Sequence, residues 1–202
     1  MEFYGNFIKS IVGGFLIGIG GTCFLSVDDK LIGSLLFSVG LLAICTTNNL
    51  LFTGKASYTL EKRYLFTILL GNFIGASLLG GVIRFCLPRL HDKAIIICQN
   101  KMNEGLRIIP LGVLCNILIY FAIEGYKRRQ TILLIMCVVA FIICGFEHCI
   151  ANMYYFAVAN IMTYKGVFYL LANIFSNLLG GFIVQIFNGL LKMVGCDEKQ
   201  WW

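Results

Sequence analysis

Long apolar runs separated by short polar segments dominate the 202 residues of the chain. A hydrocarbon core about 30 Å thick needs roughly 20 apolar residues per helix, so runs of this size predict membrane-spanning helices. Six runs qualify, and the only charged residue inside any of them is Glu147: 10–27, 31–53, 64–83, 108–123, 130–164 and 166–191. Because the runs are continuously apolar instead of alternating, they favour helices over the strands of a barrel. We expect an all-α integral membrane protein with six transmembrane helices.

Composition points the same way and excludes a soluble globule. Hydrophobic residues make up 59% of the chain and charged residues 13%, and the mean hydropathy is +0.86. This leaves too little polar surface to cover a soluble fold. The N-terminal run could be a signal peptide, but Glu2 stands where a positive region belongs and Lys9 is the only cation there. We interpret it as the first helix, with the lipid bilayer as its surroundings and no nucleic-acid partner.

One longer polar segment, 84–107, divides the chain. Its charged residues predict an extramembrane linker within a single transmembrane domain, 1–202, whose halves lie at about 1–83 and 108–202. With both termini in the cytoplasm, nine Lys and Arg residues lie inside and seven outside, most of the latter in the linker. Since short cytoplasmic loops carry an excess of positive charge, we expect a multi-pass protein of the cell membrane with both termini cytoplasmic.

The third helix of each half carries the same short pattern. It is Asn-x-x-Gly, with Asn72 and Gly75 in the first half and Asn177 and Gly180 in the second. Because each half contains three helices, the two halves run in opposite directions across the membrane. The sequence therefore predicts an inverted 3+3 repeat, an arrangement in which helices are often broken at mid-membrane.

Polar residues interrupt the second helix of each half. In helix two, Thr46, Thr47, Asn48 and Asn49 precede the stretch "LLFTGK", and in helix five the stretch "CGFEHCIANM" contains Glu147 beside His148. A broken helix leaves backbone N–H groups without partners, so each half-helix presents a partial positive charge at its N-terminus. Two such ends facing each other at mid-membrane favour a small anion.

Glu147 and His148 are the central candidates for function. An ionisable group at membrane depth costs several kcal/mol on insertion scales, and for that reason it indicates a functional site. The alternative is a structural role in which both side chains pair with polar neighbours and hold the bundle together. Histidine, with an ordinary pKa of about 6.5, is the better candidate for contact with a substrate that is itself a weak acid.

Other chemistries find little support. Six cysteines fall within predicted spans, where cysteine acts as a small hydrophobe, while Cys86 and Cys98 share the linker and could form a disulfide. His91 and His148 lie in different environments and no HExxH motif occurs, so we expect no metal and no cofactor. No nucleophile is paired with a base, which argues against an enzyme. A neutral-solute channel of the aquaporin type would carry two Asn-Pro-Ala boxes, and they are missing.

Three stretches together resemble the formate/nitrite transporter family over nearly the whole chain. They are "LLFTGK" in the second helix, "LCNILIYFAIEG" in the fourth and "GFEHCIANMYYF" in the fifth. The resemblance implies an aquaporin-like six-helix protomer in a homopentamer. Each protomer would have its own pore for small monovalent anions such as formate, nitrite, hydrosulfide or lactate.

The resemblance also implies roles for individual residues. The central pore histidine falls on His148, the loop threonine on Thr53, the vestibule lysine on Lys101 and the preceding glutamate, which orients the histidine, on Glu147. Two asparagines, Asn116 of the fourth helix and Asn177 of the sixth, also match pore positions. Asn116, together with Glu147, would orient the histidine and tie the broken helix. The hydrophobic slits correspond to Phe37 and Phe141 on the outer side and to Leu41, Leu51 and Phe52 on the inner side. Two departures from the family pattern, Leu50 before the "LFTG" stretch and Lys55 after it, would alter the inner vestibule.

The implied mechanism combines these parts. Lys101 and the half-helix ends attract an anion, the slits remove its water, and His148 with Thr53 offers hydrogen bonds at the narrow centre. Desolvation disfavours a charged carboxylate there, so His148 could donate a proton to it. The choice of anion, and passage as an anion or as a neutral acid, stay open at this point.

Overall fold

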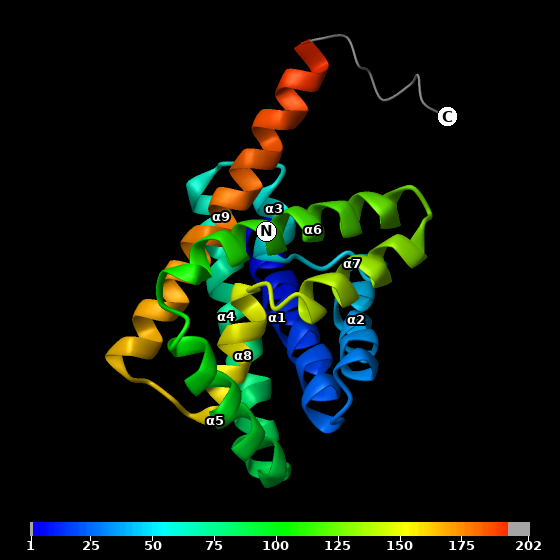
Figure 1. The fold of residues 1–202 in the computed structure, drawn as a ribbon. Helices are drawn as coiled ribbons and strands as arrows, with labels where there is room; N and C mark the ends of the chain where they lie inside the picture. Colours follow the sequence, from blue (N-terminus) through cyan, green and yellow to red (C-terminus); the bar gives the residue numbers. More distant parts are fainter. Residues whose placement is uncertain (1, 194–202) are drawn as a thin grey trace.

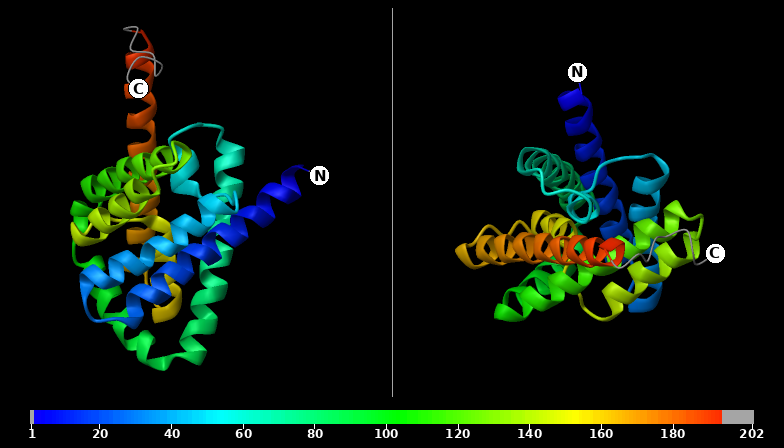
Figure 2. Two further views of the ribbon diagram at one scale, coloured as in Figure 1. Left: turned by 90° about the vertical axis from the view of Figure 1, so that its right-hand side faces the viewer. Right: turned by 90° about the horizontal axis from the view of Figure 1, so that it is seen from above.

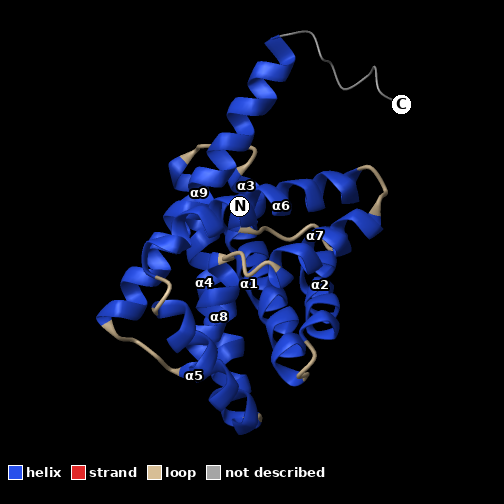
Figure 3. Ribbon diagram, in the orientation of Figure 1, coloured by secondary structure: helices blue, strands red, loops and turns tan. Residues whose placement is uncertain are grey.

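The computed structural model describes residues 2–193, and every regular element in that range is a helix (Figure 3). The all-helical prediction is thus confirmed for the described range. The elements in chain order are α1 (Glu2–Ser26), α2 (Lys30–Thr46), α3 (Phe52–Ala56), α4 (Lys62–Cys86), α5 (Pro88–Met102), the 3₁₀ turn η1 (Gly105–Arg107), α6 (Ile108–Lys127), α7 (Thr131–Ile143), α8 (Cys149–Ala159) and α9 (Tyr164–Met193).

Four of the described helices are long and apolar enough to cross a membrane: α1, α4, α6 together with η1, and α9. The apolar helices α2, α7 and α8 are shorter. In space α1 packs against α2 and α4, and α6 packs against α7 and α9, while α2 meets α7 and α4 meets α8 (Figures 1 and 2). The set of α1, α2 and α4 therefore meets the second part of the chain mainly through the shorter helices α2, α7 and α8.

Two interruptions replace what would otherwise be continuous helices. The first break is residues 47–51, between α2 and α3, and the second break is residues 144–148, between α7 and α8. Asn48 in the first and Gly145 in the second have positive φ angles of 53° and 74°, a conformation that asparagine and glycine tolerate best. Both interruptions fall where polar residues interrupt the apolar runs of the sequence.

The glycine of each Asn-x-x-Gly pattern lies at a close contact between two helices. A Cβ atom at Gly180 would lie 2.6 Å from the carbonyl oxygen of Val113 in α6, and one at Gly75 would lie even closer to Ile11 O in α1. Only glycine allows the two backbones to approach this closely. As a result Asn72 and Asn177, one turn earlier, are completely buried and aim at the breaks.

The sequence predicted that the segment 84–107 is an extramembrane linker, but the structure shows more order there. Most of it forms α5, which packs against α8. Leu90, Ala94 and Cys98, spaced four residues apart, are fully buried on one face of this helix, and its charged residues occupy the other positions. The many charged residues of this segment led to the prediction of a linker. An amphipathic helix needs only a few apolar residues at this spacing, so it is compatible with high charge.

Candidate functional site

His148 is the last residue of the second break and caps α8. Its side chain is 2% exposed, and Nδ1 accepts a hydrogen bond from the backbone N–H of Ala151 at 3.1 Å. Because Nδ1 is an acceptor, the proton of a neutral imidazole lies on Nε2. That proton points at Thr53 Oγ1, which is 2.9 Å away. The cap therefore determines which nitrogen faces Thr53.

Thr53 belongs to the other half of the chain. It lies in α3, directly after the first break, and is fully buried. The bond between Thr53 and His148 thus joins the two breaks across 95 residues of sequence. The two residues that the sequence analysis placed at the pore centre are in direct contact.

One asparagine holds each break. Asn72 Nδ2 donates to Ser10 O at 2.6 Å and to Leu50 O at 2.8 Å, and its Oδ1 accepts from Phe52 N–H at 2.8 Å. These bonds attach the first break to α1 and α4. They also occupy the first N–H group of α3. The sequence predicted that this group would be free to bind an anion, and that prediction is wrong for Phe52 N–H.

The second break is attached in the same way by Asn177. Its Nδ2 donates to Gly112 O and to Glu147 O, each at 2.8 Å, and its Oδ1 accepts from Cys149 N–H at 2.8 Å. The first N–H group of α8 is therefore occupied too. Asn177 supports the backbone of Glu147 and lies behind the break.

Glu147 is not the isolated charge that the sequence suggested. Lys101 of α5 donates to both carboxylate oxygens at 2.7 and 2.6 Å, and Asn152 Nδ2 donates to Oε2 at 2.7 Å. The side chains of Glu147 and Lys101 are 2% and 17% exposed, respectively. Lys101 is consequently held by Glu147 and is not a free cation in the vestibule. Asn152 and Asn173, which donates to Glu147 O at 2.9 Å, complete this network and were missed by sequence reasoning.

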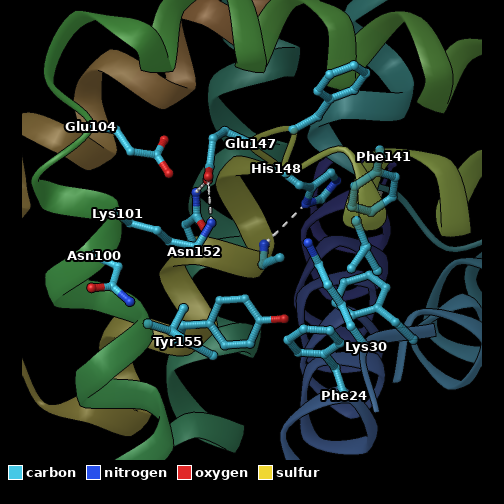
Figure 4. A pocket seen from close by; sticks show the side chains of 16 residues that line it. Phe24, Lys30, Asn100, Lys101, Glu104, Phe141, Glu147, His148, Asn152 and Tyr155 are labelled. Atoms are coloured by element: carbon cyan, nitrogen blue, oxygen red, sulfur yellow. Dashed lines mark hydrogen bonds and ion pairs between the residues drawn. The ribbon is translucent and has the colours of Figure 1, made fainter. Parts of the chain in front are cut away.

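A cavity of about 240 Å³ opens beside His148 (Figure 4). We call it the His148 cavity. Its wall includes Lys30, Phe37, Lys101, Glu104, Phe141, Glu147 and His148. Phe141 packs edge-on against Phe37 with ring centres 5.9 Å apart, and it stacks on the imidazole of His148 with ring centres 6.0 Å apart. Both phenylalanines of the predicted outer slit thus lie next to the histidine.

A second cavity, of about 390 Å³, lies beside the first break. We call it the Lys55 cavity, and its wall includes Leu41, Asn48, Asn49, Leu51, Gly54, Lys55, Tyr58 and Lys127. Leu41 and Leu51 of the predicted inner slit are therefore on a cavity wall. Gly54, next to Thr53 in the chain, is on this wall, and His148, which is bonded to Thr53, is on the wall of the first cavity.

Four predicted site residues lie on neither cavity wall: Thr53, Phe52, Asn116 and Asn177. Phe52 is buried in the core cluster. Asn116 is fully buried, and with its amide oriented to satisfy both ends it donates to Thr53 O at 3.0 Å and accepts from Gly181 N–H at 3.2 Å. It holds α3 in place, which fits the role of tying the broken helix, and it does not line either cavity.

The described residues contain no cluster of three or more His, Cys, Asp or Glu side chains arranged for a metal ion. Cys86 and Cys98 are both free, Cys86 on the surface and Cys98 in the core. The disulfide considered for this pair is therefore not present.

Comparison with known protein families gives a match over residues 1–193 to the family described as "Formate/nitrite transporter". Among curated proteins, the chain is 28% identical over 148 residues to "Formate channel FocA" of Haemophilus influenzae, covering 62% of this chain and 52% of FocA. It is 29% identical over 182 residues to "Formate channel FocB" of Escherichia coli, covering 73% and 64%. It is 30% identical over 187 residues to "Uncharacterized transporter YwcJ" of Bacillus subtilis, covering 75% and 72%. The chain thus spans about half of FocA and less than two thirds of FocB.

Solved structures share the fold. A structure titled "Pentameric formate channel with formate bound" superposes with a TM-score of 0.83 at 24% identity, over 95% of this chain and 98% of the other. An "FNT family ion channel" superposes with a TM-score of 0.80 at 23% identity, over 95% and 90%. At these identities the likeness concerns the fold, that is, the course of the backbone.

Proposed function

The chain belongs to the formate/nitrite transporter family, and we propose that it is a channel or transporter for small monovalent weak-acid anions of the formate, nitrite and hydrosulfide class. It is an all-helical integral membrane protein, and the curated relatives named above are channels and transporters, not enzymes. The observation that carries the proposal is the buried contact of Thr53 with His148, beside a cavity whose wall carries Phe37, Phe141 and His148.

The pathway follows from what each group can offer. An anion in the His148 cavity meets the edges and faces of Phe37 and Phe141, which replace part of its hydration shell without replacing its hydrogen bonds. At the contact between the two breaks, Nε2–H of His148 and the hydroxyl of Thr53 supply polar hydrogens. A substrate that separates the two side chains would receive both hydrogen bonds.

Proton transfer would use the same atom. Nδ1 of His148 accepts from Ala151 N–H, so Nε2–H is the ring group that faces a carboxylate at the centre. Transfer of this proton requires the imidazolium form, in which Nδ1 has taken a second proton and released Ala151 N–H, and it leaves a neutral ring protonated on Nδ1. Loss of water disfavours the charged form of the carboxylate and favours this transfer. Glu147, tied to Lys101, and Asn177, tied to the backbone of Glu147, position the histidine without touching the substrate.

The six-helix inverted repeat is part of the proposal. The first half would consist of α1, of α2 with α3, and of α4, within about 1–83. The second would consist of α6, of α7 with α8, and of α9, within about 108–202. The support is the matching set of bonds: Asn72 reaches α1, the first break and α3, and Asn177 reaches α6, the second break and α8.

We further propose a homopentamer in the cell membrane with both termini in the cytoplasm. Even numbers of crossings place both ends on one side, and α1 begins on the same side of the molecule as that on which α9 ends (Figure 2). In this orientation the His148 cavity faces outward. Native mass spectra in mild detergent test the assembly, and a monomer there would contradict it.

The decisive experiment is a flux panel in proteoliposomes. Formate, nitrite, hydrosulfide, lactate and chloride are compared at two pH values, since the first four are conjugate bases of weak acids and chloride is not. We expect the weak acids to pass much faster than chloride, with rates that rise as the pH falls. Chloride passing as readily as formate would refute the weak-acid pathway.

A further inference from the structure

Two lysines line the His148 cavity, and they are in different electrostatic states. Lys101, on the α5 side, gives two of its protons to the carboxylate of Glu147. Lys30, the first residue of α2, extends along the facing wall with its nitrogen toward Phe141 and His148 (Figure 4). Because a bidentate ion pair cancels most of the charge that an approaching anion would sense, Lys30 is the stronger attractor of the two.

Lys30 has no carboxylate partner among the described residues. The ion pairs there join Lys93 to Asp28, Lys101 to Glu147 and Lys127 to Glu124. The two acids that precede Lys30 in sequence are engaged elsewhere: Asp28 binds Lys93 at 2.6 Å, and Asp29 Oδ1 accepts from Ile32 N–H at 2.8 Å as the cap of α2. In the described part of the chain, no ion pair therefore offsets the charge of Lys30.

The one bond of Lys30 aims it at the second break. Its Nζ donates to the carbonyl oxygen of Ile143, the last residue of α7, at 3.0 Å. In a continuous helix that carbonyl would accept from the N–H of Glu147, which instead donates to Leu111 O at 3.2 Å. Lys30 thus satisfies an acceptor left over by the break, and two of its three protons remain available.

We propose that Lys30 is the cation that recruits the anion at the mouth of the His148 cavity, and that Lys101 is a positioning residue for Glu147. The proposal rests on the proposed function and adds to it a residue outside the family pattern noted in the sequence. The ligand is a compact monovalent anion such as formate, which can accept both free protons of one ammonium group. From Lys30 it passes directly to the phenylalanine pair and His148.

The variant Lys30→Gln separates recruitment from helix capping, because the glutamine amide can still donate to Ile143 O but carries no charge. We expect the half-saturating formate concentration to rise roughly three- to tenfold, as for loss of one steering charge at a pore mouth. The maximal rate should stay near wild type, and the dependence of flux on added salt should flatten. Lys30→Arg should restore all three properties.

Lys165→Gln is the matched control. Lys165 also has no acidic partner among the described residues, donates to the amide oxygen of Asn103 at 2.8 Å and does not line the cavity. Its replacement removes the same charge, and we expect the half-saturating concentration to stay unchanged. Equal effects of the two variants, or a lower maximal rate of Lys30→Gln at unchanged half-saturation, would overturn the recruiting role.

A flux-independent measurement keeps the two proposals separate. Formate should slow acylation of the Lys30 amine by an amine-reactive reagent, followed by peptide mass spectrometry, while Lys165 should not be protected. If formate protects Lys30 but the wild-type protein does not transport formate, the result would support the Lys30 site and refute the channel. Formate transport without protection, and without an effect of Lys30→Gln, would refute the Lys30 site alone.

Discussion

The first and second breaks are held by the same set of asparagine hydrogen bonds, which we call the asparagine frame, and they differ in the side chains that they present. Each is held by one fully buried asparagine that donates to two backbone carbonyls and accepts from the first N–H group of the following helix. After the first break, α3 continues for only five residues, and after the second, α8 continues for eleven, ten of them buried.

The polar residues of the two breaks are also different in kind. Asn48 and Asn49 in the first break are neutral and, together with Lys55, line one cavity. The second break contains Glu147 and His148, with Lys101 supplied by α5. The common asparagine frame sets the course of the backbone, and the second break alone adds titratable chemistry. Variants of the two breaks can therefore test the frame and the chemistry separately.

Replacing either asparagine should produce the largest loss of stability, and a similar one in both halves. Asn72→Ala or Asn177→Ala removes three buried hydrogen bonds and leaves backbone groups without partners, at a cost of about 3–5 kcal/mol in total. Thermal unfolding and the assembled fraction in detergent measure the effect. Asn188→Ala, which removes one partly buried bond to Tyr120, is the control. A mild phenotype of only one of the two variants would show that the frames are not equivalent.

The ion pair should come next, and it has no counterpart at the first break. Glu147→Gln or Lys101→Gln leaves a buried charge without its partner and should destabilise the assembled protein by about 3 kcal/mol. The double variant should be closer to wild type than the sum of the two losses, because no uncompensated charge remains. A double-mutant cycle on unfolding midpoints tests this expectation. Additive losses would mean that the two side chains act independently.

His148→Phe should keep the fold and reduce formate flux on the order of tenfold or more, because the ring volume is retained and the hydrogen bond and proton are lost. His148→Asn, which cannot titrate, separates two routes: passage of the anion would survive, while the pH dependence of neutral-acid passage would disappear. Thr53→Val, on the first break, should reduce flux less, since Nε2 of His148 can still bind substrate. Wild-type flux in an assembled His148→Phe protein would make the histidine structural.

The apolar walls should affect size selection more than rate. Phe141→Ala widens the passage beside His148, so the ratio of lactate to formate flux should rise about threefold or more through relief of steric exclusion. Leu51→Ala should act in the same direction from the other cavity. Phe52→Ala is the control, because Phe52 lies on neither cavity wall. An unchanged ratio in Phe141→Ala would remove this residue from the pathway.

The smallest expected effect concerns Glu104, on the wall of the His148 cavity. Its Oε2 atom is buried without a hydrogen-bond partner, and burial, with the charge of Glu147, raises the pKa of the carboxyl group although Lys101 and Arg107 oppose the shift. As the pH falls through this raised pKa, the cavity loses a negative charge. Glu104→Gln should therefore increase formate uptake about twofold at neutral pH and have no effect in acid, where wild-type Glu104 is already neutral. Initial rates at constant formate-ion concentration measure this, and a ratio independent of pH would contradict it.

Local properties of the chain were readable from the sequence alone. Apolar runs predicted helices, because a segment in lipid must satisfy its own backbone hydrogen bonds. Polar residues inside two of these runs indicated the two breaks. The motifs around Thr53 and His148 indicated the family, and the repeated Asn-x-x-Gly pattern indicated which two residues would be equivalent. The family resemblance placed both Thr53 and His148 at the centre of the pore, and the structure adds that the two side chains touch.

Tertiary structure alone decided which distant groups meet. Lys101 and Glu147 are separated by 46 residues, and Lys30 and Ile143 by 113, so no local pattern could pair them. The helical state of α5 was hidden by its charges, and its face toward α8 determined that Lys101 would reach Glu147. Phe52 and Asn116 are similar in sequence context to pore residues, yet packing turned both away from the cavities. Helix breaks depend on the order of residues along the chain, whereas charge pairing and pore lining depend on how whole helices are rotated against one another.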